Sequence, residues 1–290
     1  MIINRARIIG AALAVITTVL VLVNQRQVGI ARDELIYMST GDRYAEWWAG
    51  FVTFQHGVGP ENIEKTWGGA PGSGNNTEHP PLIKTMIGVS HKLFKGVLGE
   101  VTSYRLPGAL LHGLLVLLVY MMVLQLWGLA EAIVSALLVM LLPRALFHAG
   151  LAAFDAPIMS LWFAAVYAYW RCLDGRRWPW QAGVVFGLAL ATKHTALLLP
   201  FTLGLHYMII GFRAGGVRGM VMHHWRLIVS LAIVGPLTLY VLWPWLWYAP
   251  VAHLQQWLTF HLTHVHYNFE YLGHNWNAPR FPWHVAIVTT

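Results

Sequence analysis

Long stretches without charged side chains divide this sequence and limit what it can fold into. Residues 8–23 carry no charge, and residues 105–126 carry a single one, at Arg105. Further apolar runs follow at residues 130–142, 156–170, 182–192, 196–212 and 227–247. A helix needs about 20 mostly apolar residues to cross the hydrocarbon core of a bilayer, and it satisfies its own backbone polar groups there. The pattern therefore predicts an all-α, polytopic transmembrane helix bundle.

Composition excludes other classes of protein. The 290 residues are 57% hydrophobic and only 11% charged, which excludes a soluble domain with an ordinary charged surface. The net charge of +7 arises from basic residues at the edges of apolar runs, and no glycine-rich phosphate loop follows a strand pattern. Neither nucleic acid nor a nucleotide sugar is therefore indicated as a partner. A single cysteine, Cys172, excludes an intramolecular disulfide.

The distribution of basic residues predicts how the chain crosses the membrane. Residues 24–105 hold eight basic and eight acidic side chains, whereas the segments expected inside hold eight arginines against Glu131 and Asp174. These arginines are Arg5, Arg7, Arg171, Arg176, Arg177, Arg213, Arg218 and Arg226. Because positively charged loops stay in the cytoplasm, we expect a cytoplasmic N-terminus and extracytoplasmic segments at 24–104 and 248–282. In a bacterium the protein would then lie in the inner or plasma membrane.

Both extracytoplasmic segments are expected to carry helices that lie along the membrane surface. Residues 82–98 are mildly amphipathic, and residues 251–268 show three distinct faces at helical spacing. We expect a single transmembrane domain, 1–290, whose long first outer loop is residues 24–104. The apolar run at 283–290 is too short to cross a bilayer, so we also expect that the chain is truncated at its C-terminal end.

Two polar motifs in the first outer segment could carry chemistry. Adjacent carboxylates on a loop, Asp33 and Glu34, can divide their roles, one accepting a proton and the other positioning its neighbour. The alternative is a solvated charge cluster at the membrane edge. Further along, His79-Pro80-Pro81-Leu82-Ile83-Lys84 would hold His79 and Lys84 in a fixed relation at the start of a helix, whose dipole favours an anion. A simple proline turn is the alternative.

Five motifs in a fixed order resemble those of the GT-C glycosyltransferases that use polyprenyl-phosphate-linked sugars. The nearest relatives within that superfamily are the protein O-mannosyltransferases and the aminoarabinose lipid A transferases. The motifs cover most of residues 30–200, and each is weak alone whereas the series is specific. They are Asp33-Glu34-x-x-Tyr37, His79-Pro80-Pro81-Leu82-x-Lys84, Arg105-Leu106-Pro107-Gly108-Ala109-Leu110, Asp155-Ala156-Pro157 and Gly187-Leu188-Ala189-x-x-Thr192-Lys193.

The resemblance implies a GT-C-like fold and an enzyme that moves a sugar from a polyprenyl-phosphate donor to a hydroxyl of a protein, lipid or glycan. It makes Asp33 the base that deprotonates the acceptor, with Glu34 assisting or binding substrate. The residues implied for the lipid-linked phosphate are Lys84, Arg105 and Lys193, and those implied for the rest of the substrate cavity are Tyr37, His79 and Asp155. No cofactor is expected. A divalent metal stays open, because the acidic pair is not an Asp-x-Asp motif.

Other interpretations remain open at the level of sequence. A transporter or flippase of lipid-linked sugars, or a membrane subunit without catalytic activity, would also need charges near the membrane. His261-x-x-His264-x-His266 could hold a metal ion, although interfacial histidines are the plainer interpretation. The aromatic run at residues 243–248 is typical of a belt at the membrane boundary.

Overall fold

The computed structural model describes residues 2–55, 57–69, 75–173, 179–263, 269–276 and 281–288. Its helices are α1 (Ile2–Asn24), α2 (Arg32–Val52), α3 (Pro60–Trp67), α4 (Leu82–Leu98), α5 (Glu100–Leu126), α6 (Leu129–Leu141), α7 (Pro143–Ala149), α8 (Asp155–Cys172), α9 (Trp180–Leu190), α10 (Leu199–Val229), α11 (Gly235–Leu242), α12 (Pro250–Leu262) and α13 (Val285–Val288). Short helical turns are η1 (Gln25–Gln27), η2 (His194–Leu198), η3 (Ser230–Val234) and η4 (Pro244–Trp247), and β1 (Phe269–Tyr271) pairs with β2 (His274–Trp276).

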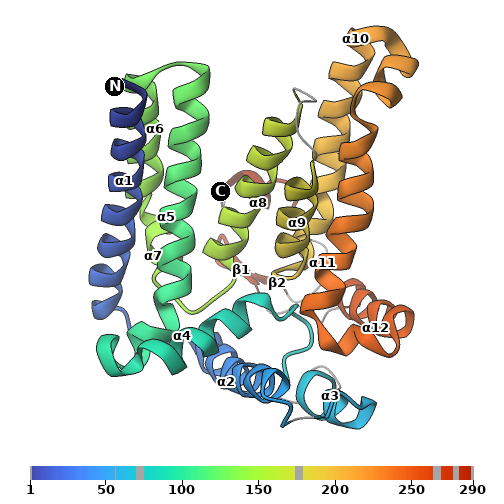
Figure 1. Cartoon of the computed structure of the whole chain (residues 1–290). Helices are drawn as coiled ribbons and strands as arrows, with labels where there is room; N and C mark the ends of the chain where they lie inside the picture. The colour runs from blue at the N-terminus through green and yellow to red at the C-terminus, as the bar shows by residue number, and fades with distance from the viewer. Residues whose placement is uncertain are drawn as a thin grey trace.

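The long helices form two groups, with shorter helices across one end (Figure 1). Helices α1, α5 and α6 stand together, and α8, α9, α10 and α11 form the second group. Helices α2, α3 and α12 lie at the lower end in this view, with α4 between them and the long helices. An all-α polytopic bundle, as the sequence predicts, is therefore confirmed. The antiparallel hairpin of β1 and β2 was not predicted.

Four segments of the described chain are long and apolar enough to cross a membrane: Arg5–Gln27, Glu100–Leu126, His194–Arg213 and Trp225–Leu242. Helices α6 and α7 together would make a fifth, although they meet at an angle of 62°. The last two of the four segments belong to one helical run that turns back on itself at Gly215 and Gly216, whose positive φ angles of 151° and 65° suit glycine.

Boundaries differ from the sequence-based expectation at several places. Helix α5 begins five residues before Arg105, where the predicted span begins. Helices α8 and α9 form where apolar runs predicted helices, but they are not among the four candidate spans. The helix predicted at 251–268 ends at Leu262, and residues 264–268 lie outside the described part. Also outside it are several residues used in the topology and motif arguments: Asp174, Arg176, Arg177, His264 and His266.

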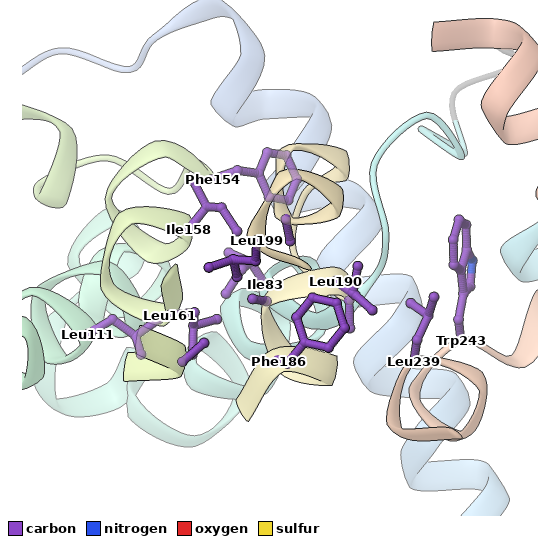
Figure 2. Close-up of a cluster of buried hydrophobic side chains, with 14 of the residues drawn as sticks. Ile83, Leu111, Phe154, Ile158, Leu161, Phe186, Leu190, Leu199, Leu239 and Trp243 are labelled. Atoms are coloured by element: carbon purple, nitrogen blue, oxygen red, sulfur yellow. The ribbon is translucent and has the colours of Figure 1, made fainter. Parts of the chain in front are cut away.

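The largest cluster of buried apolar side chains joins both groups of long helices to the shorter helices at one end. Figure 2 shows side chains from α4, α5, α8, α9, α10 and α11 meeting there, among them Ile83, Leu161 and Phe186. Trp243 and Trp245 also belong to this cluster and are 1% and 2% exposed. The expected aromatic belt is therefore wrong for these two tryptophans, because their rings pack inside the protein and not against lipid.

A close helix crossing fixes α2 on α4. Gly41 of α2 faces Gly88 of α4, and a Cβ atom at Gly88 would overlap the Gly41 carbonyl. Two backbones can approach this closely only where neither residue has a side chain. The crossing therefore holds α2, and with it the acidic pair at its start, in a fixed place relative to α4.

Candidate active site

A cavity of about 770 Å³ lies where the start of α2, the segment before α4, the start of α8 and α12 come together. Both polar and apolar side chains line it. The residues are Ala31, Arg32, Asp33, Glu34, Ile36, Tyr37, Asn76, Glu78, His79, His148, Leu151, Ala153, Phe154, Asp155, Lys193, His194, Phe260 and His261. The structure thus brings together six of the eight residues predicted for the site: Asp33, Glu34, Tyr37, His79, Asp155 and Lys193. Lys84 and Arg105 do not line this cavity.

The two adjacent carboxylates occupy opposite environments. The sequence predicted that they lie on a loop, but the structure places them in the first turn of α2. Asp33 is exposed and makes no hydrogen bond or ion pair with any residue in the described ranges. Glu34 is 1% exposed, and its oxygens accept four hydrogen bonds: two from Arg105 and one each from the backbone N–H groups of Ala31 and Ala152, all at 2.7–2.8 Å. Only Asp33 is free to act on a substrate.

Arg105 is a buried hub that ties α5 to the start of α2. Besides both oxygens of Glu34, its guanidinium donates to the Gln25 side chain and to the carbonyls of Gln25, Val28 and Gly29 at 2.8–3.1 Å. The side chain is 1% exposed, and protein acceptors occupy its donors. The geometry therefore gives Arg105 a positioning role, in place of the direct contact with donor phosphate that the resemblance implies.

Asp155 and Lys193 form the polar pair at the other side of the cavity. Asp155 begins α8 and Lys193 precedes η2, and their Oδ1 and Nζ atoms are 2.7 Å apart. His148 of α7 approaches the other Asp155 oxygen at 3.7 Å through Nδ1. Lys193 is thus the lysine that reaches the cavity, and Asp155 holds its ammonium group in place.

Tyr37, His79 and Phe154 form an aromatic wall. The Phe154 ring centroid lies 4.5 Å from that of Tyr37 and 4.6 Å from that of His79. Burial, and then the nearby carboxylates led by Asp33, raise the pKa of Tyr37, so its hydroxyl stays protonated and can donate. Burial, and then Lys84, keep the pKa of His79 well below 6.5, so its imidazole stays neutral.

Lys84 is fully buried beneath the cavity wall and not inside the cavity. Its Nζ donates to the backbone and side-chain oxygens of Asn76 and, at 2.8 Å, to the His79 carbonyl. It also lies 5.2 Å from the Tyr44 ring centroid. Pro81, two residues after His79, has helical backbone angles and caps the N-terminal end of α4. Lys84 therefore holds the 76–79 segment, which supplies cavity residues, against α4.

We expect Lys84 to make stability depend on pH. Burial is the main cause that lowers its pKa from 10.5 to about 7. Between these pH values the unfolded chain binds the proton and the folded chain does not, so unfolding free energy should rise as pH increases from 7 toward 10.5. Lys84→Met should remove this part of the slope in unfolding measurements in mixed micelles. The matched control is Lys92→Met, the same substitution at an exposed lysine of α4 that pairs with Glu46.

Several cavity residues were not predicted from sequence. Glu78 stands next to the His79 motif, and its Oε2 is buried without a hydrogen-bond partner in the described structure. Its carbonyl accepts from Trp257 Nε1 at 3.0 Å and contacts His261 Nε2 at 2.9 Å, which docks α12 on the site. Trp257 and His261 are four residues apart on α12 and therefore lie on the same face of that helix. No sequence motif identified His148, which lies on α7.

The described residues contain no evident metal-binding site. Within those ranges, no group of three or more His, Cys, Asp or Glu side chains is arranged to hold a metal ion. His264 and His266 of the histidine motif lie outside them, so the possibility of a histidine site stays untested.

Several helices apolar enough to span a membrane, with a charged cavity at one end, define a class: polytopic membrane proteins with a polar site at one end of the helix bundle. The family model described as dolichyl-phosphate-mannose-protein mannosyltransferase matches residues 78–243, more than half of the chain. The chain therefore belongs to this family and is a membrane glycosyltransferase of the mannosyltransferase type. The predicted GT-C resemblance is thereby confirmed. No curated protein and no solved structure matched the chain. The match includes Asp155 and Lys193 but begins after Asp33.

Proposed function

We propose that this protein transfers a sugar from a polyprenyl-phosphate donor to a hydroxyl acceptor, with Asp33 as general base. The observation that carries the proposal is one cavity that holds an exposed, unpaired carboxylate, Asp33, together with a cation, Lys193. An acceptor hydroxyl must lose a proton in this reaction, and a phosphate must leave with its negative charge. Asp33 and Lys193 match these two requirements.

The reaction needs few groups from the protein. The acceptor oxygen attacks the anomeric carbon while the bond from that carbon to the phosphate oxygen breaks, and Asp33 takes the acceptor's proton. The released polyprenyl phosphate is a good leaving group near neutral pH, so no general acid is obligatory. Direct displacement inverts the anomeric configuration. Tyr37, which stays protonated, can donate a hydrogen bond to the sugar or to the departing phosphate, and neutral His79 lines the same wall.

The distribution of charged residues supports one side of the membrane for this reaction. The sequence asymmetry of Lys and Arg supports a cytoplasmic N-terminus. With that orientation, the cavity, which lies beyond the C-terminal end of α1, would face the extracytoplasmic side. Donor lipids would reach it from the outer leaflet. The acceptor is a protein, lipid or glycan that meets the cavity from the same side.

The proposal is tested by release of polyprenyl phosphate in proteoliposomes. Polyprenyl-phosphate-linked mannose, glucose and aminoarabinose would each be supplied with three acceptors: a Ser/Thr peptide, a glycolipid and an oligosaccharide. We expect one donor to release polyprenyl phosphate in an acceptor-dependent way, with a product of inverted configuration. If no donor releases it, while labelled donor moves between leaflets, the protein is a transporter and the proposal is wrong.

A further inference from the structure

A second pocket lies between α3, η4 and the start of α12, at the same end of the molecule as the candidate active site (Figure 1). Its volume is about 390 Å³, and it shares no lining residue with the active-site cavity. Its lining includes two carboxylates and three rings, those of Glu61, Glu64, Trp245, Tyr248 and His253. Among the described residues, no lysine or arginine lines it. We call it the α3 pocket.

The charge in the α3 pocket is not balanced within the described structure. Glu61 is exposed and has no hydrogen bond or ion pair with the residues described. Glu64 accepts hydrogen bonds from the Gly69 backbone N–H at 2.8 Å and from Trp245 Nε1 at 3.0 Å, but both donors are neutral. Lys65 of the same helix does not line the pocket. Two negative charges therefore remain for a ligand to neutralise.

The rings of the α3 pocket favour the same kind of ligand. Tyr248 is half exposed beside the carboxylates. The ring of His253 stacks on Trp245 with centroids 4.2 Å apart, and its Nδ1 contacts the Trp245 carbonyl, so that wall is fixed. An ammonium or guanidinium group is attracted by aromatic faces as well as by carboxylates. The pocket thus suits the cationic end of a lysine or arginine side chain.

Helix α12 connects the α3 pocket to the active-site cavity. His253 lines the pocket and His261 lines the cavity, and both lie on one face of the helix with Trp257 between them. A helix rises about 1.5 Å per residue, so the two sites are about 12 Å apart along its axis. An extended chain covers that distance in about four residues, at about 3.3 Å each.

We propose that the α3 pocket binds a lysine or arginine of a polypeptide acceptor, about four residues from the serine or threonine whose hydroxyl meets Asp33. This inference rests on the proposed function and assigns the acceptor to the protein class. A polypeptide can present a cation and a hydroxyl at this distance. Phosphate groups of a lipid acceptor would be repelled by Glu61 and Glu64, and a neutral glycan has no cation to offer them.

A panel of acceptor peptides tests the proposal with the donor that turns over. Each peptide would carry one serine in a neutral sequence and one lysine at a distance of one to eight residues on either side. A lysine about four residues away should raise kcat/KM by about fivefold or more over alanine at that position. Glutamate there should lower it, and salt should shrink the gain. Equal kcat/KM for all the peptides would overturn the proposal.

Changing the pocket charge should change the preference for the peptide. Glu61→Gln should remove most of the preference for lysine, and Glu61→Lys should transfer it to the glutamate peptide. The control Glu46→Gln removes an exposed carboxylate of α2 that lines neither space, and it should keep the preference for lysine. An equal loss in the control would show that overall charge attracts the peptide, and would overturn the role of the pocket.

Cross-linking tests the contact without turnover. A carbodiimide joins a carboxylate to an amine that touches it, so the lysine peptide should become linked to Glu61 of the wild-type protein, as located by mass spectrometry. A peptide with alanine in place of serine should be linked equally. No link at Glu61 or Glu64 would overturn the proposal even if the enzyme is active. A link without transfer from any donor would support the pocket and overturn the proposed function. Transfer only to a glycolipid or an oligosaccharide would overturn the assignment of a polypeptide acceptor.

Discussion

Asp33→Asn should lower kcat for polyprenyl phosphate release by at least about 100-fold, the lower end of what a positioned general base contributes. The substitution keeps the size of the side chain and removes its ability to accept the acceptor's proton. Asp33 is exposed and has no partner in the described structure, so its loss should not destabilise the fold. Donor KM should change little, because the base acts on the acceptor and not on the phosphate.

The matched control for Asp33 lies on the same helix. Glu46→Gln removes an exposed carboxylate of α2 that pairs with Lys92 at 3.3 Å, outside the cavity. It should leave release of polyprenyl phosphate unchanged. If Asp33→Asn and Glu46→Gln retain the same activity, Asp33 is not the base, and Glu78 or Asp155 becomes the candidate, since both carboxylates line the same cavity.

The fold class was predictable because the apolar runs are long and nearly free of charge. Periodicity also predicted the helix of which α12 is part, but not that Trp257 and His261 would dock it on the site. It could not show that Trp243 and Trp245 pack internally, since lipid and protein interiors select the same apolar side chains. The sequence did predict two separate spans at 196–212 and 227–247, and the structure adds that the chain reverses between them at Gly215 and Gly216.

The sequence predicted several of the polar residues that meet in the candidate cavity, but not the contacts that each of them makes. Motif spacing selected six residues that the fold brings to one cavity, although they come from α2, α8 and the connecting segments. The resemblance made Asp33 the base, but only the structure shows that Asp33 is exposed whereas Glu34 is buried and bonded to Arg105. It also assigned Lys84 and Arg105 to the phosphate, whereas protein oxygens surround both in the structure. The contacts of Arg105 join residues 71–80 positions apart, whereas those of Lys84 reach back five and eight positions, and motif spacing shows neither set.

The ion pair between Glu34 and Arg105 should make the largest single contribution to the stability of the site. Both side chains are 1% exposed, and two charge-assisted hydrogen bonds of 2.7 and 2.8 Å join them. Glu34→Gln would leave a buried guanidinium without its counter-charge, which typically costs about 3–5 kcal/mol. We expect a loss of this size in unfolding free energy, measured by titration from mixed micelles into sodium dodecyl sulfate.

Acid should weaken the same contact in the wild-type protein. Burial alone would raise the pKa of Glu34, but the hydrogen bonds from Arg105, Ala152 and Ala31 together lower it below its ordinary value of 4.5. A carboxylate with a lowered pKa contributes stability above its unfolded pKa and loses it as pH falls through the folded pKa. The difference in stability between wild type and Glu34→Gln should therefore be full at neutral pH and shrink below about pH 4.5.

Two comparisons distinguish a structural role of Glu34 from a catalytic one: the stability of a variant that breaks an exposed ion pair, and the activity of Glu34→Gln. Lys92→Met, which breaks the exposed pair with Glu46, should cost less than about 1 kcal/mol. Where Glu34→Gln remains folded, it should retain much more activity than Asp33→Asn, because its carboxylate holds Arg105 and the start of α2 and does not meet the acceptor. A variant as stable as wild type but as inactive as Asp33→Asn would show that Glu34 takes part in the reaction itself.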